Sequence, residues 1–272
     1  EGLTAFDLYN TTVEGTCPSD MDEGSGADLF VWGGNRNYTL GLSHGNDSAL
    51  PERVKLKCNE RRTPLIAGAR FNRPHVRDIS MSRWHTVLAT NEPRKNVYVC
   101  GIGSQARLGR SAQSLPTFEP LRDFSDTANT VVAGSDHTII VTETGAVYTF
   151  GSNRMAQLGY AIEEGLGVVS SSSGTKRSGA TSHPNQHSLQ GPVSDVSGVE
   201  LDLQVTPRRV QGPLKREVII GAAASRLHSV AYTASALYTW GTNNGQLGYD
   251  RHSAPVQVQP RRVTVVSVPV RQ

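Results

Sequence analysis

A short phrase that occurs four times along the chain constrains its fold more than any other feature. The clearest copies run from Val147 to Gly159 and from Leu237 to Gly248, and shorter versions begin at Val97 and Leu29. Each copy has alternating apolar and aromatic residues that end in glycine, then a polar turn, and then Leu-Gly. Such self-similarity is typical of a repeat array, in which each unit covers the apolar face of its neighbour.

The alternation predicts a strand, because successive strand side chains point to opposite faces. The glycine after the aromatic residue ends that strand, where a positive φ or a close backbone approach is expected. The leucine of each Leu-Gly is expected to pack back under the polar turn. The repeated positions that we expect to be structural are Trp32, Gly33, Leu40, Gly41, His85, Gly101, Leu108, Gly109, His137, Phe150, Gly151, Leu158, Gly159, His228, Trp240, Gly241, Leu247 and Gly248.

Two further elements accompany the phrase. A histidine-containing turn and a β-branched strand precede the three later copies, with the histidines at His85, His137 and His228. A proline-containing segment follows each Leu-Gly loop, beginning at Pro51, Pro116, Pro207 and Pro260. Several short strands per unit, joined by turns, predict antiparallel blades and an all-β fold.

These residues resemble the repeat of the regulator of chromosome condensation family, which forms seven-bladed β-propellers. The shared marks are Gly-x-x-His-Thr/Ser, an aliphatic strand, Val-Tyr-x-aromatic-Gly, an asparagine in the turn, and Gln-Leu-Gly. The resemblance covers about residues 28–272 apart from one insertion, and implies a β-propeller. Four units and part of a fifth do not close seven blades, so we expect a partial or truncated ring. Either the missing blades lie beyond Gln272 or this subfamily builds an incomplete propeller, and truncation is favoured because an open array leaves apolar faces and strand edges unpaired.

The chain is expected to divide into four parts. Residues 1–10 are similar to the end of an ankyrin repeat and predict a short helical remnant, and residues 11–27 have the composition of a linker. Residues 28–272 hold the propeller repeats. Within them, a Ser/Gly-rich stretch at about 161–203 has few apolar residues and no periodicity, which predicts a disordered insertion. Its serines fit regulation by phosphorylation, and the alternative is a tolerated surface loop.

Composition sets limits on the class of protein. The chain has 272 residues, a net charge of +3, and 37% hydrophobic residues. It contains no apolar run of about 18 residues, so no membrane span is expected. Three scattered cysteines, with Cys100 in an aromatic slot of the repeat, favour reduced thiols and an intracellular protein. The first unit is rich in Lys and Arg, which fits either a nucleic-acid patch or a solvated blade edge, and the missing aromatic platform favours the edge.

No catalytic, cofactor or metal site is predicted. Asp136 precedes His137 and Ser229 follows His228, but these histidines recur once per unit, whereas a catalytic set must converge in one place. We therefore expect their ring nitrogens to tie each turn to a neighbouring backbone. The Gly101-Ile102-Gly103 segment lacks the third glycine of a dinucleotide fingerprint, and His183 and His187 have no further ligands at metal spacing. The chain is predicted not to be an enzyme.

An ankyrin-like start followed by propeller repeats also resembles the inhibitor of Bruton's tyrosine kinase family, which combines ankyrin repeats, propeller repeats and BTB domains. This resemblance implies a cytoplasmic or nuclear interaction scaffold that recruits substrates for a cullin-type ubiquitin ligase. Its partners would be other proteins, such as a kinase or a ubiquitination substrate, with the cullin bound through a domain outside this chain. The alternatives are a guanine-nucleotide exchange factor for a small GTPase and a chromatin-associated binder; nucleic acid is not the favoured partner.

Overall fold

The computed structural model describes residues 27–56, 74–111, 113–162 and 202–264. The expected ankyrin remnant, nearly all of the linker, most of the Ser/Gly-rich insertion, Cys17 and Cys58 lie outside these residues. The described chain is all-β and antiparallel, which confirms the predicted fold class. No helix in it is long and apolar enough to span a membrane.

The strands form one two-stranded and three four-stranded sheets. The small sheet pairs β1 (Phe30–Gly33) with β2 (Ser48–Arg53). The second sheet has the order β3 (Val76–Met81), β4 (His85–Thr90), β5 (Val97–Gly101) and β6 (Leu115–Pro120). The third has the order β7 (Ala128–Ala133), β8 (His137–Thr142), β9 (Val147–Ser152) and β10 (Leu203–Arg209). The fourth has the order β11 (Gly221–Ala224), β12 (His228–Tyr232), β13 (Leu237–Thr242) and β14 (Val256–Arg262).

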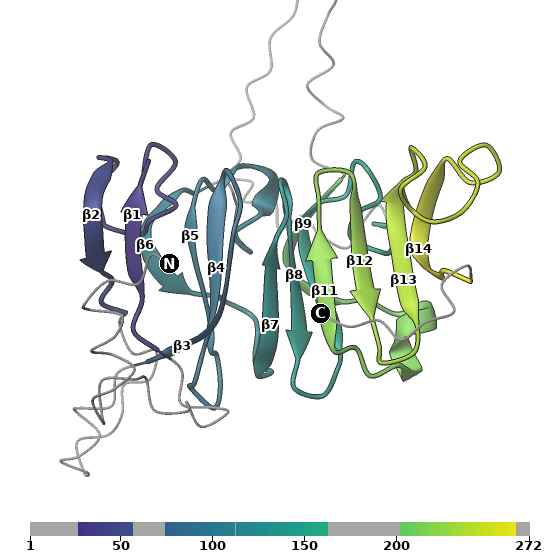
Figure 1. The fold of residues 1–272 in the computed structure, drawn as a ribbon, viewed down its shortest axis with the longest axis horizontal. Coiled ribbons are helices and arrows are strands. Elements are labelled where there is room, and N and C mark those ends of the chain that lie inside the picture. The colour runs from purple at the N-terminus through teal and green to yellow at the C-terminus, as the bar shows by residue number, and fades with distance from the viewer. Residues whose placement is uncertain (1–26, 57–73, 112, 163–201, 265–272) are drawn as a thin grey trace, which may run out of the picture.

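The four sheets lie in a row that starts with β1 and β2 and ends with β14 (Figure 1). The first strands of neighbouring four-stranded sheets contact each other, β3 against β7 and β7 against β11. Two short 3₁₀ helices, η2 (Ser104–Ala106) and η4 (Gly212–Arg216), lie in the connections. The arrangement is that of successive propeller blades, and the two ends of the row lie apart.

The first strand of each full sheet is an element that the repeated phrases do not reveal. β3, β7 and β11 lie directly before the three histidine turns, whereas the sequence pattern begins each unit at the turn itself. Their sequences, VRDISM, ANTVVA and GAAA, have no position at which all three carry the same residue type. Because no residue repeats in all three strands, self-comparison of the sequence does not detect them.

The glycine that ends each aromatic strand is required by the strand beside it. Gly101 pairs with His85, Gly151 with His137, and Gly241 with His228. A Cβ atom on any of these glycines would lie 2.6–2.7 Å from the Cα of the paired histidine, and all three have φ between +113° and +120°. Both the conformation and the close approach exclude larger residues.

The apolar core lies between the sheets rather than inside any one of them. One cluster joins the second and third sheets through residues such as Val99, Leu108 and Phe150, and another joins the third and fourth through Ile139, Leu158 and Trp240. A smaller cluster around Tyr98 and Phe118 connects the second sheet to the first. Each sheet therefore depends on its neighbour for burial, as expected of a repeat array.

Candidate functional site: an arginine-lined pocket across three blades

The repeated histidines lie at the junctions between sheets. The Nε2 atom of His85 is 2.8 Å from Thr138 Oγ1, and Nε2 of His137 is 2.8 Å from Ser229 Oγ. Each hydroxyl donates its own proton to a loop carbonyl, Thr138 to that of Arg107 and Ser229 to that of Gln157. The imidazole must then donate through Nε2. The rings thus bond to a side-chain hydroxyl of the next blade, not directly to its backbone as expected.

Burial keeps both junction histidines neutral. It lowers the pKa of His85 to about 3, with a further contribution from the positive charge of Arg107. It also lowers the pKa of His137 to about 4, although the adjacent Asp136 acts in the opposite direction. Neutral imidazole suits the relay, because the unprotonated Nδ1 can accept the Ser82 hydroxyl at 3.0 Å in the first case. Nδ1 of His137 has no partner, since Gly134 stands where Ser82 does.

The contact between His137 and Ser229 does not provide an activated nucleophile. Both side chains are completely buried, and the proton of the Ser229 hydroxyl is directed to the carbonyl of Gln157. Asp136, which would have to orient the imidazole, instead bonds to Arg107. A hydroxyl that a substrate cannot reach and that lacks an aligned base and orienting group has a structural use here.

The remaining repeated positions divide by location. Phe150, Trp240 and Cys100 occupy the aromatic slot and are fully buried, with Cys100 a free thiol. Trp32 occupies the same slot in β1 and is 62% exposed. The four leucines of the Leu-Gly pairs are all buried: Leu40, Leu108, Leu158 and Leu247. The following glycines all have positive φ: Gly41, Gly109, Gly159 and Gly248.

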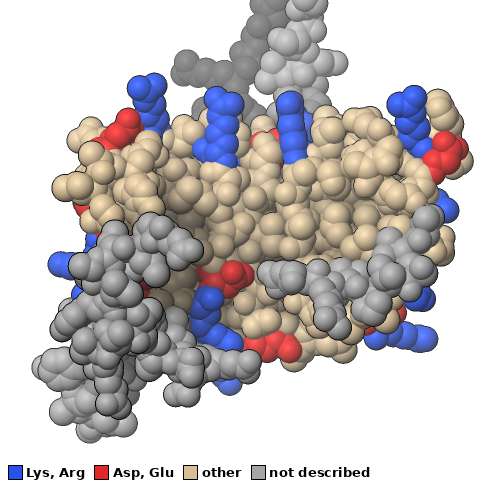
Figure 2. Space-filling model, viewed as in Figure 1, with Lys and Arg blue, Asp and Glu red and all other residues tan. Residues whose placement is uncertain are grey.

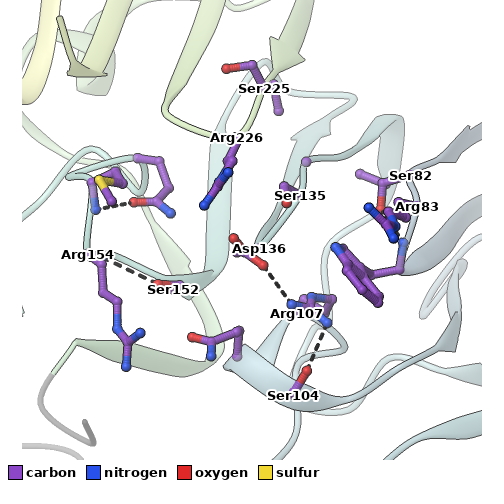
Figure 3. Close-up of a pocket in the computed structure, with 17 residues that line it drawn as sticks. Ser82, Arg83, Ser104, Arg107, Ser135, Asp136, Ser152, Arg154, Ser225 and Arg226 are labelled. Atoms are coloured by element: carbon purple, nitrogen blue, oxygen red, sulfur yellow. Dashed lines mark hydrogen bonds and ion pairs between the residues drawn. The ribbon is translucent and has the colours of Figure 1, made fainter. Parts of the chain in front are cut away.

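A pocket of about 700 Å³ opens on the face that carries the histidine turns. Three of these turns line it, together with the loops that follow β5 and β9 (Figure 3). Four arginines contribute to its wall, Arg83, Arg107, Arg154 and Arg226, and Asp136 is the single acidic residue among the lining side chains. The volume lies within the usual range of about 300–1,000 Å³ for ligand sites.

One arginine of the pocket is structural. The side chain of Arg107 is 4% exposed, and its Nη2 atom lies 2.7 Å from Asp136 Oδ1. Its Nη1 atom donates to Ser104 Oγ at 3.0 Å, and its guanidinium lies over the Trp84 ring at 5.7 Å. This pair neutralises the acidic residue of the pocket and fixes the floor between the second and third sheets.

The other three arginines are exposed. The guanidinium of Arg83 also lies over the Trp84 ring, 4.8 Å from its centroid. Arg154 and Arg226 are exposed and form no salt bridge with any residue in the described ranges. Figure 3 shows the Arg226 side chain extending from the turn between β11 and β12 toward Asp136. Three unneutralised guanidinium groups from three different sheets therefore surround the pocket.

Comparison with known proteins supplies the family. Residues 129–157 match the "Regulator of chromosome condensation (RCC1) repeat" family. This segment is an RCC1 repeat. The matched segment contains all of β8 and β9, most of β7, and the His137 turn, so the resemblance seen in the sequence is confirmed.

The relatives of this RCC1-repeat chain are much longer proteins. It is 32% identical to BTB/POZ domain-containing protein 1 of Schizosaccharomyces pombe, across 99% of this chain and 18% of that protein. It is 29% identical to human inhibitor of Bruton tyrosine kinase, across 98% of this chain and 16% of that protein. The chain thus spans less than a fifth of these relatives. A third relative, bovine secretion-regulating guanine nucleotide exchange factor, is 27% identical across 88% of this chain and 40% of that protein.

Solved structures support the fold. The crystal structure of Kap60 bound to yeast RCC1 (Prp20) matches with a TM-score of 0.60 and 16% identity, over 88% of this chain and 46% of that one. At this identity the likeness shows the RCC1 propeller fold alone. It agrees with the row of four-stranded antiparallel sheets in the described residues.

Sequence reasoning on the RCC1 repeats found the residues that join the blades but not those that line the pocket. Of the pocket arginines, Arg83 alone belongs to the first unit, whose richness in Lys and Arg is visible in the sequence. Other members of that group serve elsewhere, with Arg53 bonded to Asp28 at 2.7 Å and Arg77 to Glu143 at 3.0 Å. The sequence signal that could have found these arginines is their position relative to the repeated residues. Arg83 and Arg226 both stand two residues before a repeated histidine, while Arg154 lies in a Leu-Gly loop.

Proposed function

We propose that these RCC1 repeats form a non-catalytic protein-interaction module of a longer protein. The observation that carries the proposal is how the repeated and the variable residues are distributed. Most of the repeated His, Ser/Thr, Leu and aromatic side chains are buried between sheets, with Trp32 and His228 at the two ends of the row as exceptions, whereas Arg83, Arg154 and Arg226 are exposed around one pocket. A rigid stack of blades that presents variable side chains from its turns is suited to binding.

The finer proposal is that the module is a scaffold, or the substrate-recruiting part of an adaptor for a cullin-type ubiquitin ligase. It is supported by similarity over almost the whole chain to a BTB/POZ domain-containing protein and to inhibitor of Bruton tyrosine kinase. In this arrangement the repeats would bind the substrate or a kinase, and a region outside residues 1–272 would bind the cullin. The protein would work in the cytoplasm or the nucleus.

Affinity capture followed by mass spectrometry tests this proposal in the full-length protein. Three baits are compared: the unchanged protein, a deletion of residues 28–272, and the triple variant Arg83→Ala, Arg154→Ala, Arg226→Ala. We expect the deletion to lose a set of partners while a cullin is retained, and the triple variant to lose part of that set. Loss of no partner with the deletion would contradict an interaction role.

A guanine-nucleotide exchange factor is the second candidate, because bovine secretion-regulating guanine nucleotide exchange factor is 27% identical across 88% of this chain. Catalysed release of labelled nucleotide from a small GTPase, and preferential capture of its nucleotide-free form, would favour it. A chromatin-associated binder is the third reading, and would require DNA binding that weakens steeply with salt.

A further inference from the structure

The pocket has a marked charge imbalance that points to the chemistry of a ligand. Its wall contains four arginines and one aspartate, with neither lysine nor glutamate among the lining residues. The buried Arg107 neutralises Asp136 through a 2.7 Å contact, so Arg83, Arg154 and Arg226 remain to interact with a ligand. A guanidinium is a planar fork that matches the two oxygens of a carboxylate, and such charge-assisted pairs are stronger than neutral hydrogen bonds.

The three exposed arginines come from different blades. Arg83 lies in the turn after β3, Arg154 in the loop after β9, and Arg226 in the turn after β11. A ligand that engages all three must extend across the pocket and carry more than one negative group. The half-buried Ser135 and the exposed Ser104 also line the wall and add hydroxyl donors between these arginines.

The remaining wall suits a peptide better than a nucleic acid. Trp84 is the single aromatic residue among the lining side chains, and the guanidinium groups of Arg83 and Arg107 already lie over its ring. Binding of single-stranded nucleic acid normally combines a basic track with several stacking aromatics. Figure 2 shows Lys and Arg projecting from the upper edge of the molecule with acidic side chains among them, rather than one continuous basic track.

From this geometry we propose that the pocket binds an acidic segment of a partner protein, with Arg83, Arg154 and Arg226 donating to its side-chain carboxylates. The proposal rests on the interaction role proposed above and names the chemistry of the partner. Arg107 is a positioning residue, because its bonds to Asp136 and Ser104 hold the wall on which the other arginines stand.

Fluorescence anisotropy with a synthetic peptide tests the proposal directly. The probe is a fluorescein-labelled twelve-residue peptide of alternating Glu and Gly, and the matched probe has Gln in place of Glu. The protein is the full-length chain, compared with the triple variant Arg83→Ala, Arg154→Ala, Arg226→Ala. We expect the Glu peptide to bind, the Gln peptide not to bind, and the triple variant to bind the Glu peptide at least about tenfold more weakly.

A second triple variant controls for net charge. Arg94, Arg122 and Arg216 are exposed, lie outside the pocket wall, and form no salt bridge with residues in the described ranges. Replacing all three with alanine removes the same total charge and should change the affinity by less than about twofold, because distant surface charges are screened by salt. Circular dichroism and thermal unfolding verify that both variants remain folded.

Three results would overturn the proposal. Equal weakening by the two triple variants would show attraction by overall charge alone. Failure of the Glu peptide to bind at millimolar concentration would exclude a carboxylate site, and tighter binding of a twenty-nucleotide single-stranded DNA that the pocket variant abolishes would assign the pocket to nucleic acid. None of these would refute the interaction role itself, which fails only if deletion of residues 28–272 loses no partner.

Discussion

The junctions inside the row of sheets differ from its two ends, although both are built from the same repeated residues. Inside, the Trp240 side chain is fully buried and its Nε1 donates to the carbonyl of Gln157 in the preceding sheet at 2.8 Å. At the first end, Trp32 in the same repeat position is 62% exposed. At the last end, His228 is only partly buried, and no hydroxyl of a further sheet meets its Nε2 within the described residues.

The difference shows that a repeated residue stabilises the fold through the neighbouring blade, not within its own. Trp240 and Trp32 both precede a glycine at the same repeat position of their strands. Their burial differs because one has a preceding sheet and the other does not among the described residues. The same substitution at two equivalent repeat positions should therefore lower the free energy of unfolding by unequal amounts, with the larger loss at the position that a neighbouring blade covers.

The largest difference is expected for the two tryptophans. Trp240→Ala removes a fully buried ring and its hydrogen bond, and should lower the free energy of unfolding by about 3–5 kcal/mol. Trp32→Ala should cost less than about 1 kcal/mol, because most of that ring is already in water. Urea unfolding of the 272-residue chain measures both. Similar losses at the two positions would mean that Trp32 is covered in solution.

The pH dependence of stability should differ between the junction histidine His137 and His228 at the end of the row. His137 has a pKa near 4 in the folded chain against 6.5 for the unfolded one, so the unfolded state takes up the proton first. Its contribution to stability is complete above about pH 6.5, falls by up to about 1.4 kcal/mol per pH unit below that, and stops changing below about pH 4. His85, with a pKa of about 3, acts in the same direction.

The measurement is the free energy of unfolding at several pH values between 4.5 and 7.5. His137→Asn should flatten the dependence by nearly one proton, because the residue that titrates on unfolding is gone. His228→Asn should flatten it less, since partial burial lowers the pKa of that histidine without enclosing it. A His137→Asn variant whose stability still falls as steeply as that of the unchanged chain would contradict the buried neutral state.

Sequence self-comparison could predict the blade type because the junction residues repeat. His85, His137 and His228 each stand opposite the glycine of the next strand, and this geometric requirement recurs in each four-stranded sheet. The all-β propeller class was therefore readable from four phrases. The hydroxyl that accepts the histidine proton also belongs to the repeat, because it is the Thr or Ser directly after the histidine of the next blade. Spacing alone does not show that this hydroxyl contacts the histidine of the previous blade.

The pocket could not be predicted in the same way because its charged residues do not recur in every turn. At the position two residues before the histidine the three turns have Arg83, Ser135 and Arg226, and the following position has Trp84, Asp136 and Leu227. These side chains gather only when three turns are brought to one face by the stacking of the sheets. A site formed across blades depends on tertiary structure, which a single sequence does not display.

Two glycines at one repeat position provide the next comparison. Gly151 has φ +115°, and an added Cβ would lie 2.5 Å from the carbonyl oxygen of Asp136 and 2.6 Å from the Cα of His137. Gly33 has φ +104° but nothing within 4 Å of such an atom. Both alanine variants carry backbone strain of about 1 kcal/mol, and Gly151→Ala adds a clash with backbone atoms. Thermal unfolding should show a larger loss of stability for Gly151→Ala than for Gly33→Ala, and a still larger loss for Gly151→Val. Equal losses for the two alanine variants would mean that backbone strain at positive φ accounts for the whole effect.

The smallest difference is expected for two serines that bond to histidine rings. Ser82 Oγ lies 3.0 Å from Nδ1 of the fully buried His85, and Ser225 Oγ lies 2.7 Å from Nδ1 of the half-buried His228. Ser82→Ala leaves a buried nitrogen without a donor and should cost about 1 kcal/mol, whereas Ser225→Ala should cost less because Gln246 and water can reach the ring. The distance alone would predict the opposite order. Chemical unfolding of the two variants therefore decides whether burial or bond length governs the cost. In the His137 turn, Nδ1 is buried without a hydrogen-bond partner among the described residues, and the blade still forms. The fold therefore accommodates one such unpaired nitrogen.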